Sequence, residues 1–251
     1  MNAPPPPRMG NMQPLSVVTW LVIINIAVFI LDHFLFAGPM QQEVGPDGAV
    51  HRFRGESPLF WWGYFSSDTA FNHFQLWRVL TFQFLHADAS HIIGNLLGLY
   101  FMGPMVEQSL GRRRFLAFYL LCGVAGPIAY MGMNAVGVLD GGAGALLSGS
   151  QTPLIGASAG VFGVLVAAAV IAPRVMVQLI FPPIPMQLRT LALGLLALAT
   201  ITVFTNGHNA GGEAAHLGGA AMGFLLIRQP RLLDWIENKT KRSPRMRITW
   251  R

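Results

Sequence analysis

The sequence predicts an all-α membrane protein, a bundle of six membrane-spanning helices, and three observations support this fold class. Of its 251 residues, 53% are hydrophobic and only 11% are charged, whereas about a quarter of the residues of a soluble globular domain are charged. Six apolar windows follow one another along the chain, at 17–36, about 91–106, 115–136, 156–172, 188–205 and 212–227. If all six cross the membrane, 14 of the 17 lysines and arginines fall on one side of it.

The chain begins with a Pro-rich tail, residues 1–14, which cannot form regular structure around Pro4–Pro7. A cleaved signal peptide is the alternative interpretation of the window that follows, because Arg8 precedes an apolar run. This run is about twenty residues long, longer than the apolar region of a signal peptide, and no clean cleavage site follows it. We therefore expect window 17–36 to be a retained first helix.

A long loop, residues 37–85, separates the first two windows and is rich in aromatic residues. Aromatic rings favour the boundary between lipid headgroups and hydrocarbon, so we expect this loop to be partly embedded in the outer leaflet. A small periplasmic cap that packs on itself is the alternative. We expect Leu76–Leu85 to lead directly into the second helix. The aromatic residues of the loop are Phe53, Phe60, Trp61, Trp62, Tyr64, Phe65, Phe71, Phe74, Trp77 and Phe82.

Windows 91–106 and 212–227 are short, since a helix needs roughly 17 to 25 residues to span a bilayer. They count as spans if neighbouring residues extend them, and short Gly-rich helices suit the interior of a compact bundle. The single cysteine, Cys122, lies within the third window, where packing is its expected role. His86 and His91 are five residues apart and no His-Glu-x-x-His pattern occurs, so we expect no metal and no cofactor.

Basic residues predict the orientation. With six spans, both termini share a side with the loops after the second and fourth windows, and this side carries the 14 basic residues; only Arg52, Arg54 and Arg78 lie opposite. The positive-inside rule then puts both termini in the cytoplasm. Residues 15–228 form the predicted membrane domain, and 229–251 a basic cytoplasmic tail that contacts the inner leaflet. Nucleic-acid binding would also account for a pI near 10.2, but the tail lacks interleaved aromatic residues.

Polar side chains inside the predicted spans are candidate site residues, because they are costly in hydrocarbon. His91 and Asn95 are four residues apart, on one face of the second helix. They either serve chemistry or join helices by hydrogen bonds. Ser158 opens the fourth window, where free backbone N–H groups and the positive end of the helix dipole surround it. An ordinary helix cap is the alternative for Ser158.

The last window contains His216, one turn inside it, followed by the small residues Gly219 and Gly223. If this face packs against the fourth window, His216 and Ser158 lie at one depth, where the imidazole could accept the serine proton. The small residues of the fourth window are Gly160, Gly163 and Ala167.

With these motifs the chain resembles the rhomboid family of intramembrane serine proteases, over roughly Leu76–Ile227. The motifs that carry the resemblance are Trp77-Arg78, His91-x-x-x-Asn95, Glu107 with Gly111, Gly156-Ala157-Ser158 and His216-x-x-Gly219-x-x-x-Gly223.

The resemblance implies a rhomboid-type bundle in which Ser158 attacks the peptide carbonyl and His216 acts as general base and then general acid. His91, Asn95 and the Ser158 backbone N–H would hold the oxyanion. The substrates would be transmembrane segments of other proteins within the lipid bilayer, entering past the fifth helix. We expect a multi-pass protein of a bacterial inner membrane with both termini in the cytoplasm.

Two positions depart from the family pattern: Ala159 replaces the usual glycine after the nucleophile, and Ser109 replaces an arginine. A methyl at Ala159 is expected to narrow the backbone turn slightly. Phe162 occupies the place of an aromatic that packs on the imidazole, and we interpret Glu213 as a charge at the helix start rather than a third catalytic group.

A catalytically silent relative that only binds transmembrane helices is the rival hypothesis, and such relatives typically lack the serine or the histidine. A small-solute transporter would require charged residues at mid-membrane in broken helices, which the sequence does not show.

Overall fold

The computed structural model describes residues 15–44, 50–139, 153–179 and 183–236. The predicted Pro-rich tail, residues 1–14, and most of the basic tail, residues 237–251, lie outside the described residues.

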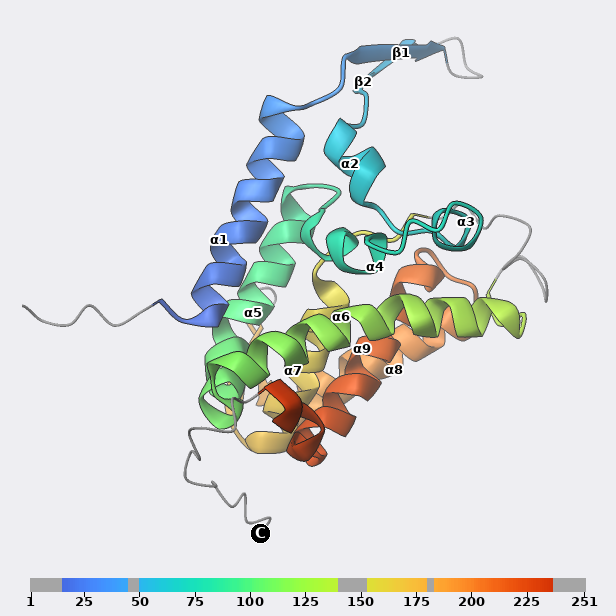
Figure 1. Cartoon of the computed structure of the whole chain (residues 1–251). Helices are drawn as coiled ribbons and strands as arrows, with labels where there is room; N and C mark the ends of the chain where they lie inside the picture. Colours follow the sequence, from blue (N-terminus) through green and yellow to red (C-terminus); the bar gives the residue numbers. More distant parts are fainter. Residues whose placement is uncertain (1–14, 45–49, 140–152, 180–182, 237–251) are drawn as a thin grey trace, which may run out of the picture.

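In the described part of the chain, six long helices form a bundle (Figure 1), and each overlaps one predicted window. Windows 91–106 and 212–227 are both extended by neighbouring residues, which is the condition that the sequence sets for counting them as spans. The helices are α1 (Val17–Ile30), α5 (Ala89–Leu110), α6 (Arg112–Ala135), α7 (Ser158–Ile171), α8 (Leu188–Phe204) and α9 (Ala210–Arg228).

Among the described residues, two helical stretches are long and apolar enough to cross a membrane by themselves, Val17–Leu35 and Arg112–Ala135. The first consists of α1 and a π-helical turn, Leu31–Leu35. The helices α7 and α8 are apolar but shorter. The six predicted helices are therefore present, while the count of six spans stays a prediction.

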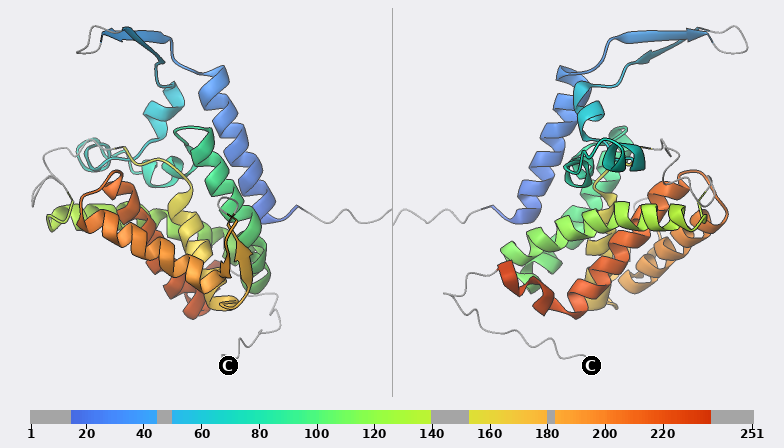
Figure 2. Two further views of the ribbon diagram at one scale, coloured as in Figure 1. Left: turned by 180° about the vertical axis from the view of Figure 1, so that it is seen from behind. Right: turned by 45° about the vertical axis from the view of Figure 1, so that its right-hand side comes forward.

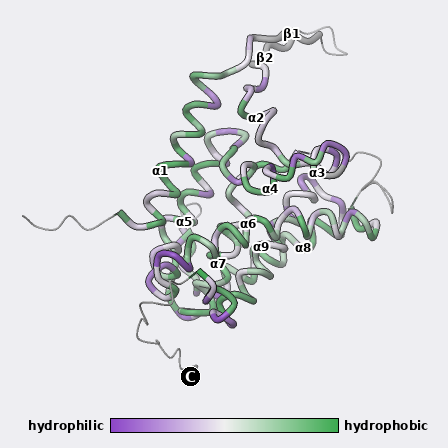
Figure 3. Tube along the Cα trace, in the orientation of Figure 1, coloured by the Kyte–Doolittle hydropathy of each residue, from purple (hydrophilic) through white to green (hydrophobic). Residues whose placement is uncertain are grey.

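Helix α7 lies at the centre of the bundle, where it contacts α5, α6, α8 and α9 (Figure 2). Most of its side chains are buried, and Val164, Ala167 and Ala168 are fully covered. Helix α1, in contrast, packs mainly on α5 and exposes large apolar side chains, among them Trp20 and Ile23. Figure 3 shows apolar residues along α1 and hydrophilic residues gathered around α3 (Ser67–Phe71). The outward face of α1 is thus suited to contact with lipid.

The loop between α1 and α5 is folded. It contains an antiparallel hairpin of β1 (Met40–Val44) and β2 (Val50–Arg54), followed by α2 (Pro58–Gly63), α3, α4 (Arg78–Thr81) and a 3-10 turn at Phe82–Phe84. A second hairpin joins α7 to α8, formed by β3 (Met176–Gln178) and β4 (Pro185–Gln187). Both hairpins are additions to the predicted all-α fold.

The expectation that Leu76–Leu85 leads directly into the second helix is wrong. Leu85 is extended, with φ −92° and ψ 146°, and α5 starts only at Ala89. Asp88 begins the new helix because its carboxylate Oδ1 accepts a hydrogen bond from the His91 backbone N–H at 2.9 Å.

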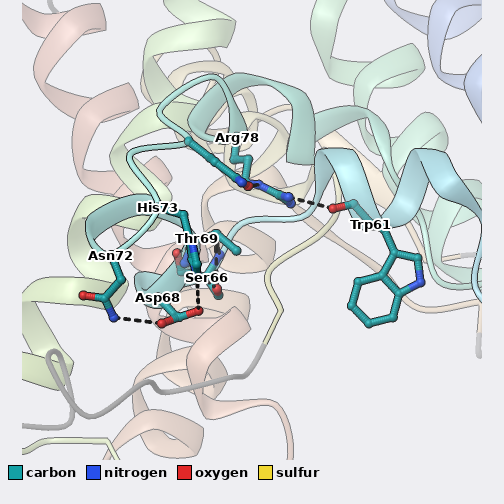
Figure 4. A network of polar contacts seen from close by, with 8 residues as sticks. Trp61, Ser66, Asp68, Thr69, Asn72, His73 and Arg78 are labelled. Carbon is teal, nitrogen blue, oxygen red and sulfur yellow. Dashed lines mark hydrogen bonds and ion pairs between the residues drawn. The ribbon is translucent and has the colours of Figure 1, made fainter.

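Arg78 holds the folded loop together from inside. Its guanidinium donates to the backbone carbonyls of Trp61 and Tyr64, both at 2.7 Å, and lies 4.7 Å from the centre of the Tyr64 ring. Burial lowers the pKa of Arg78. Figure 4 shows the hydrogen bond from Arg78 to the Trp61 carbonyl. Nearby in α3, Asp68 accepts a hydrogen bond from Asn72. The exposed Trp61 and Trp62 rings are the part of this loop that the predicted contact with the outer leaflet would use.

The carboxylate of Glu107, near the end of α5, caps the start of α1. It accepts hydrogen bonds from the backbone N–H groups of Val17 at 2.9 Å and Val18 at 3.0 Å. These N–H groups belong to the first turn of α1, where no helical partner is available. Glu107 is therefore the polar link that holds α1 against the end of α5.

Replacing Glu107 with alanine should lower the free energy of unfolding by about 2 to 4 kcal/mol, because two N–H groups lose a charged acceptor. Thermal unfolding of the purified protein in detergent measures this change. Glu107→Gln keeps one acceptor oxygen and should lose less. Equal stability of wild type and Glu107→Ala would show that the cap contributes nothing.

Candidate active site

Ser158 and His216 lie side by side, although 58 residues separate them in the chain. Ser158 is the first residue of α7, and His216 is in the second turn of α9. The distance between His216 Nε2 and Ser158 Oγ is 2.7 Å, within hydrogen-bond range. Ala157, not Ser158, occupies the cap position of α7, so the serine hydroxyl is not used as a helix cap.

The glycines of α7 and α9 make this approach possible. A Cβ atom at Gly223 would lie 2.5 Å from the Gly163 Cα atom, and one at Gly219 would overlap the Ala159 carbonyl oxygen. The two helix backbones are therefore in direct contact, and the small-residue faces that the sequence predicted to meet do meet. Close contact at these glycines sets the distance between serine and histidine.

The ring of His216 is held on two further sides. Phe162, one turn after Ser158, stacks on it with ring centres 4.3 Å apart and planes 9° from parallel. Glu213 places its Oε2 atom 2.9 Å from His216 Nδ1. Interpreting Glu213 only as a charge at the helix start missed this contact, for which the three-residue spacing to His216 was the available signal.

The ring of His91 lies against the chain just before α7. Gly156 has φ +119°, and a Cβ atom there would lie 2.6 Å from His91 Nε2 and 3.6 Å from Ser158 Oγ. The other ring nitrogen, Nδ1, accepts from the Ala87 backbone N–H at 3.4 Å. A neutral His91 with Nδ1 as acceptor carries its proton on Nε2. The donor hydrogen of the ring then lies next to Gly156, two residues before the serine.

Asn95 lies on the same face of α5 as His91, one turn further along, and is buried. Within the described residues its side-chain Nδ2 has no hydrogen-bond partner. A buried amide donor without a partner is costly, unless a ligand or reaction intermediate accepts from it. Asn95 thus offers a donor of the kind an oxyanion hole requires.

The ring of His86 packs edge-to-face against the ring of His91, with ring centres 5.1 Å apart. Burial lowers the pKa of His86 to about 4, so its ring is neutral at pH 7. In the described part of the chain, no three His, Cys, Asp or Glu side chains come together in a way that could hold a metal ion.

The methyl group of Ala159 packs between α6 and α7, and the narrowing of the backbone turn that the sequence predicts stays a prediction. Ala159 is in the first helical turn of α7 and is buried. A Cβ atom on Gly126 of α6 would lie 2.8 Å from the Ala159 Cβ atom, so the methyl occupies space that Gly126 leaves open. Pairing of these two small residues between α6 and α7 could not be found from sequence spacing.

Comparison with known proteins gives a match to the family model described as Rhomboid domain, over residues 73–229. The chain is 25% identical to Rhomboid protease AarA of Providencia stuartii over 229 residues, which cover 86% of this chain and 73% of that protein. It is 32% identical to RHOMBOID-like protein 12, mitochondrial, of Arabidopsis thaliana over 153 residues, 59% of this chain and 44% of the relative. Over 77 residues, 28% of this chain and 15% of the relative, it is 40% identical to Rhomboid protease GluP of Bacillus subtilis. The match thus spans less than half the length of the last two relatives.

Proposed function

The chain belongs to the rhomboid family, and from this premise we propose that it is an intramembrane serine endopeptidase that cuts other proteins in or near their transmembrane segments. The observation that carries the proposal is the 2.7 Å distance between Ser158 Oγ and His216 Nε2. A serine hydroxyl is a weak nucleophile until a base beside it accepts its proton.

In the proposed reaction, Ser158 Oγ attacks the peptide carbonyl while His216 Nε2 takes the hydroxyl proton. The same nitrogen then protonates the leaving amine, and water hydrolyses the acyl enzyme with His216 again as base. Three donors are available for the oxyanion: His91 Nε2, Asn95 Nδ2 and the Ser158 backbone N–H. Each such donor is worth about 3 kcal/mol of barrier lowering in hydrolases that use this device.

The proposed site lies towards the end of the bundle that carries the folded loop. Gly156, just before α7, donates from its backbone N–H to the Phe82 carbonyl at 2.9 Å. At the opposite end, Arg114 pairs with Asp234 at 2.6 Å, in the turn that follows α9. The positive-inside rule assigns this basic end to the cytoplasm and the serine to the outer half of the membrane.

We propose that substrate helices enter laterally past α8, and that six spans place the protein in a bacterial inner membrane with cytoplasmic termini. The exposed side chains of α8 include Leu193, Leu198 and Ile201, which suit contact with lipid or with an apolar helix. Segments that unwind easily and carry a small side chain at the cut are the expected substrates.

Labelling by a fluorophosphonate probe tests the proposed function. The purified wild-type protein in detergent should react covalently at Ser158, and Ser158→Ala should not react. Thermal unfolding of both proteins confirms that the variant is folded. Wild-type protein that fails to react would favour the silent, helix-binding alternative. Equal labelling of Ser158→Ala would refute Ser158 as the nucleophile.

A further inference from the structure

Glu213, in the first turn of α9, turns its side chain towards the catalytic centre. Its Oε2 atom is 2.9 Å from His216 Nδ1, while Nε2 of the same ring is 2.7 Å from Ser158 Oγ. Both side chains are partly buried, with 23% of Glu213 and 15% of His216 exposed. Carboxylate, imidazole and hydroxyl thus follow one another through two consecutive hydrogen bonds.

A charge at the helix start is the simpler explanation for Glu213, because the helix dipole favours an acidic residue in the first turn. That effect needs only the charge, and it leaves the carboxylate free to point into solvent. Here the carboxylate instead contacts the ring nitrogen that faces away from the serine. The contact with His216 is therefore a second feature, which the dipole does not explain.

The hydrogen bond between Glu213 and His216 Nδ1 has two consequences for the chemistry. A carboxylate accepts from Nδ1–H, so the neutral ring keeps its proton there and presents the lone pair of Nε2 to the serine. Once Nε2 has accepted the serine proton, the carboxylate also stabilises the imidazolium. Phe162 stacks on the ring face, a contact that does not select a tautomer, whereas Glu213 contacts the ring nitrogen Nδ1.

We propose that Glu213 is a positioning residue for His216, so that this chain works with a carboxylate, an imidazole and a hydroxyl rather than with the serine and histidine alone. As the bond from Ser158 Oγ to the carbonyl carbon forms, the proton moves from Oγ to Nε2. It moves on to the leaving nitrogen as the C–N bond breaks. Glu213 keeps its hydrogen bond to Nδ1–H throughout. This inference rests on the proposed protease function.

The test compares wild type and Glu213→Gln in detergent, by the rate of fluorophosphonate labelling and by kcat and KM for a transmembrane reporter substrate. An amide can donate to Nδ1 and so stabilise the wrong tautomer. We expect kcat and labelling rate to fall on the order of 100-fold, less than the roughly 10⁴-fold seen for a fully buried triad carboxylate. KM and the thermal unfolding midpoint should stay close to wild type. Glu213→Asp, which keeps the charge, should recover part of the rate.

Two further variants separate positioning from simple charge. Asn209→Asp combined with Glu213→Gln returns a carboxylate to the exposed cap of α9, seven residues from His216, and should not restore the rate. Asp234→Asn removes a carboxylate that pairs with Arg114 at the far end, and should leave kcat unchanged.

The outcomes distinguish this inference from the proposed function. Wild type that labels, together with Glu213→Gln that labels equally fast, overturns the role of Glu213 and leaves the protease intact. Full recovery by Asn209→Asp assigns the effect to charge at the helix start and also overturns it. Wild type that does not label refutes the proposed function, and the positioning role with it.

Discussion

Replacing Gly219 with alanine should abolish cleavage of a transmembrane reporter substrate. The added Cβ would overlap the Ala159 carbonyl oxygen and lie 2.6 Å from its carbonyl carbon. Both are backbone atoms at the start of α7, so no side chain can rotate away to make room. Overpacking typically costs about 1 to 3 kcal/mol, and it costs more where backbones must separate.

Reporter cleavage should fall by more than partial unfolding of the variant would explain, because α9 carries His216. If α9 shifts by about 1 Å, the 2.7 Å contact between His216 and Ser158 is lost. A displacement of that size costs on the order of 100-fold in rate even when it arises far from the reacting groups. Here it also separates the proposed base from the nucleophile, so the loss should be larger than this. Reporter cleavage and fluorophosphonate labelling measure the effect on activity, and thermal unfolding in detergent measures the effect on stability.

Matched controls come from helical glycines with open surroundings. Gly94 in α5 and Gly132 in α6 have nothing within 4 Å of an added Cβ atom. Alanine there should leave activity unchanged and add up to about 1 kcal/mol of stability through helix propensity. If Gly219→Ala behaved like these controls, the close contact of α7 and α9 would not be what places the histidine.

Alanine at Gly156 is expected to have the second-largest effect, for two separate reasons. The backbone of Gly156 has φ +119°, a conformation that residues other than glycine rarely adopt. The new Cβ would also lie 2.6 Å from His91 Nε2 and push the proposed oxyanion donor away from Ser158. Loss of one such donor lowers kcat by roughly 100- to 1,000-fold. Initial rates of reporter cleavage should show at least this loss.

The variant Gly111→Ala is a control that strains the backbone without displacing His91. Gly111 has φ +81° at the junction of α5 and α6, and nothing lies within 4 Å of an added Cβ atom. Gly111→Ala should therefore lower the thermal unfolding midpoint, with the activity of each folded molecule retained. Equal activity losses in both variants would mean that backbone strain, rather than the position of His91, explains the effect of Gly156→Ala.

Helix positions were predictable from the sequence because long apolar windows leave few other structures. Windows 156–172 and 188–205 agree with α7 and α8 to within two residues at each end. The break before α5 was missed because the apolar run from Leu76 was taken to continue into the helix, although it ends at Leu85. Asp88, a favoured cap residue, starts the new helix through its contact with the His91 backbone N–H. The hairpin of β1 and β2 was missed as well, because a strand needs a partner strand and the local sequence of the loop does not identify one.

For the candidate site, the sequence by itself determined which residues share a helix face. His91 and Asn95 are one turn apart on α5, and Gly219 and Gly223 follow His216 along α9; such spacings are local properties of an α-helix. Only the tertiary structure decided which faces meet, that Glu213 turns towards His216 and that Gly126 leaves room for the methyl of Ala159. The reason is physical: helix periodicity depends on neighbours a few residues away, whereas these contacts depend on how side chains far apart in the sequence fill the same space.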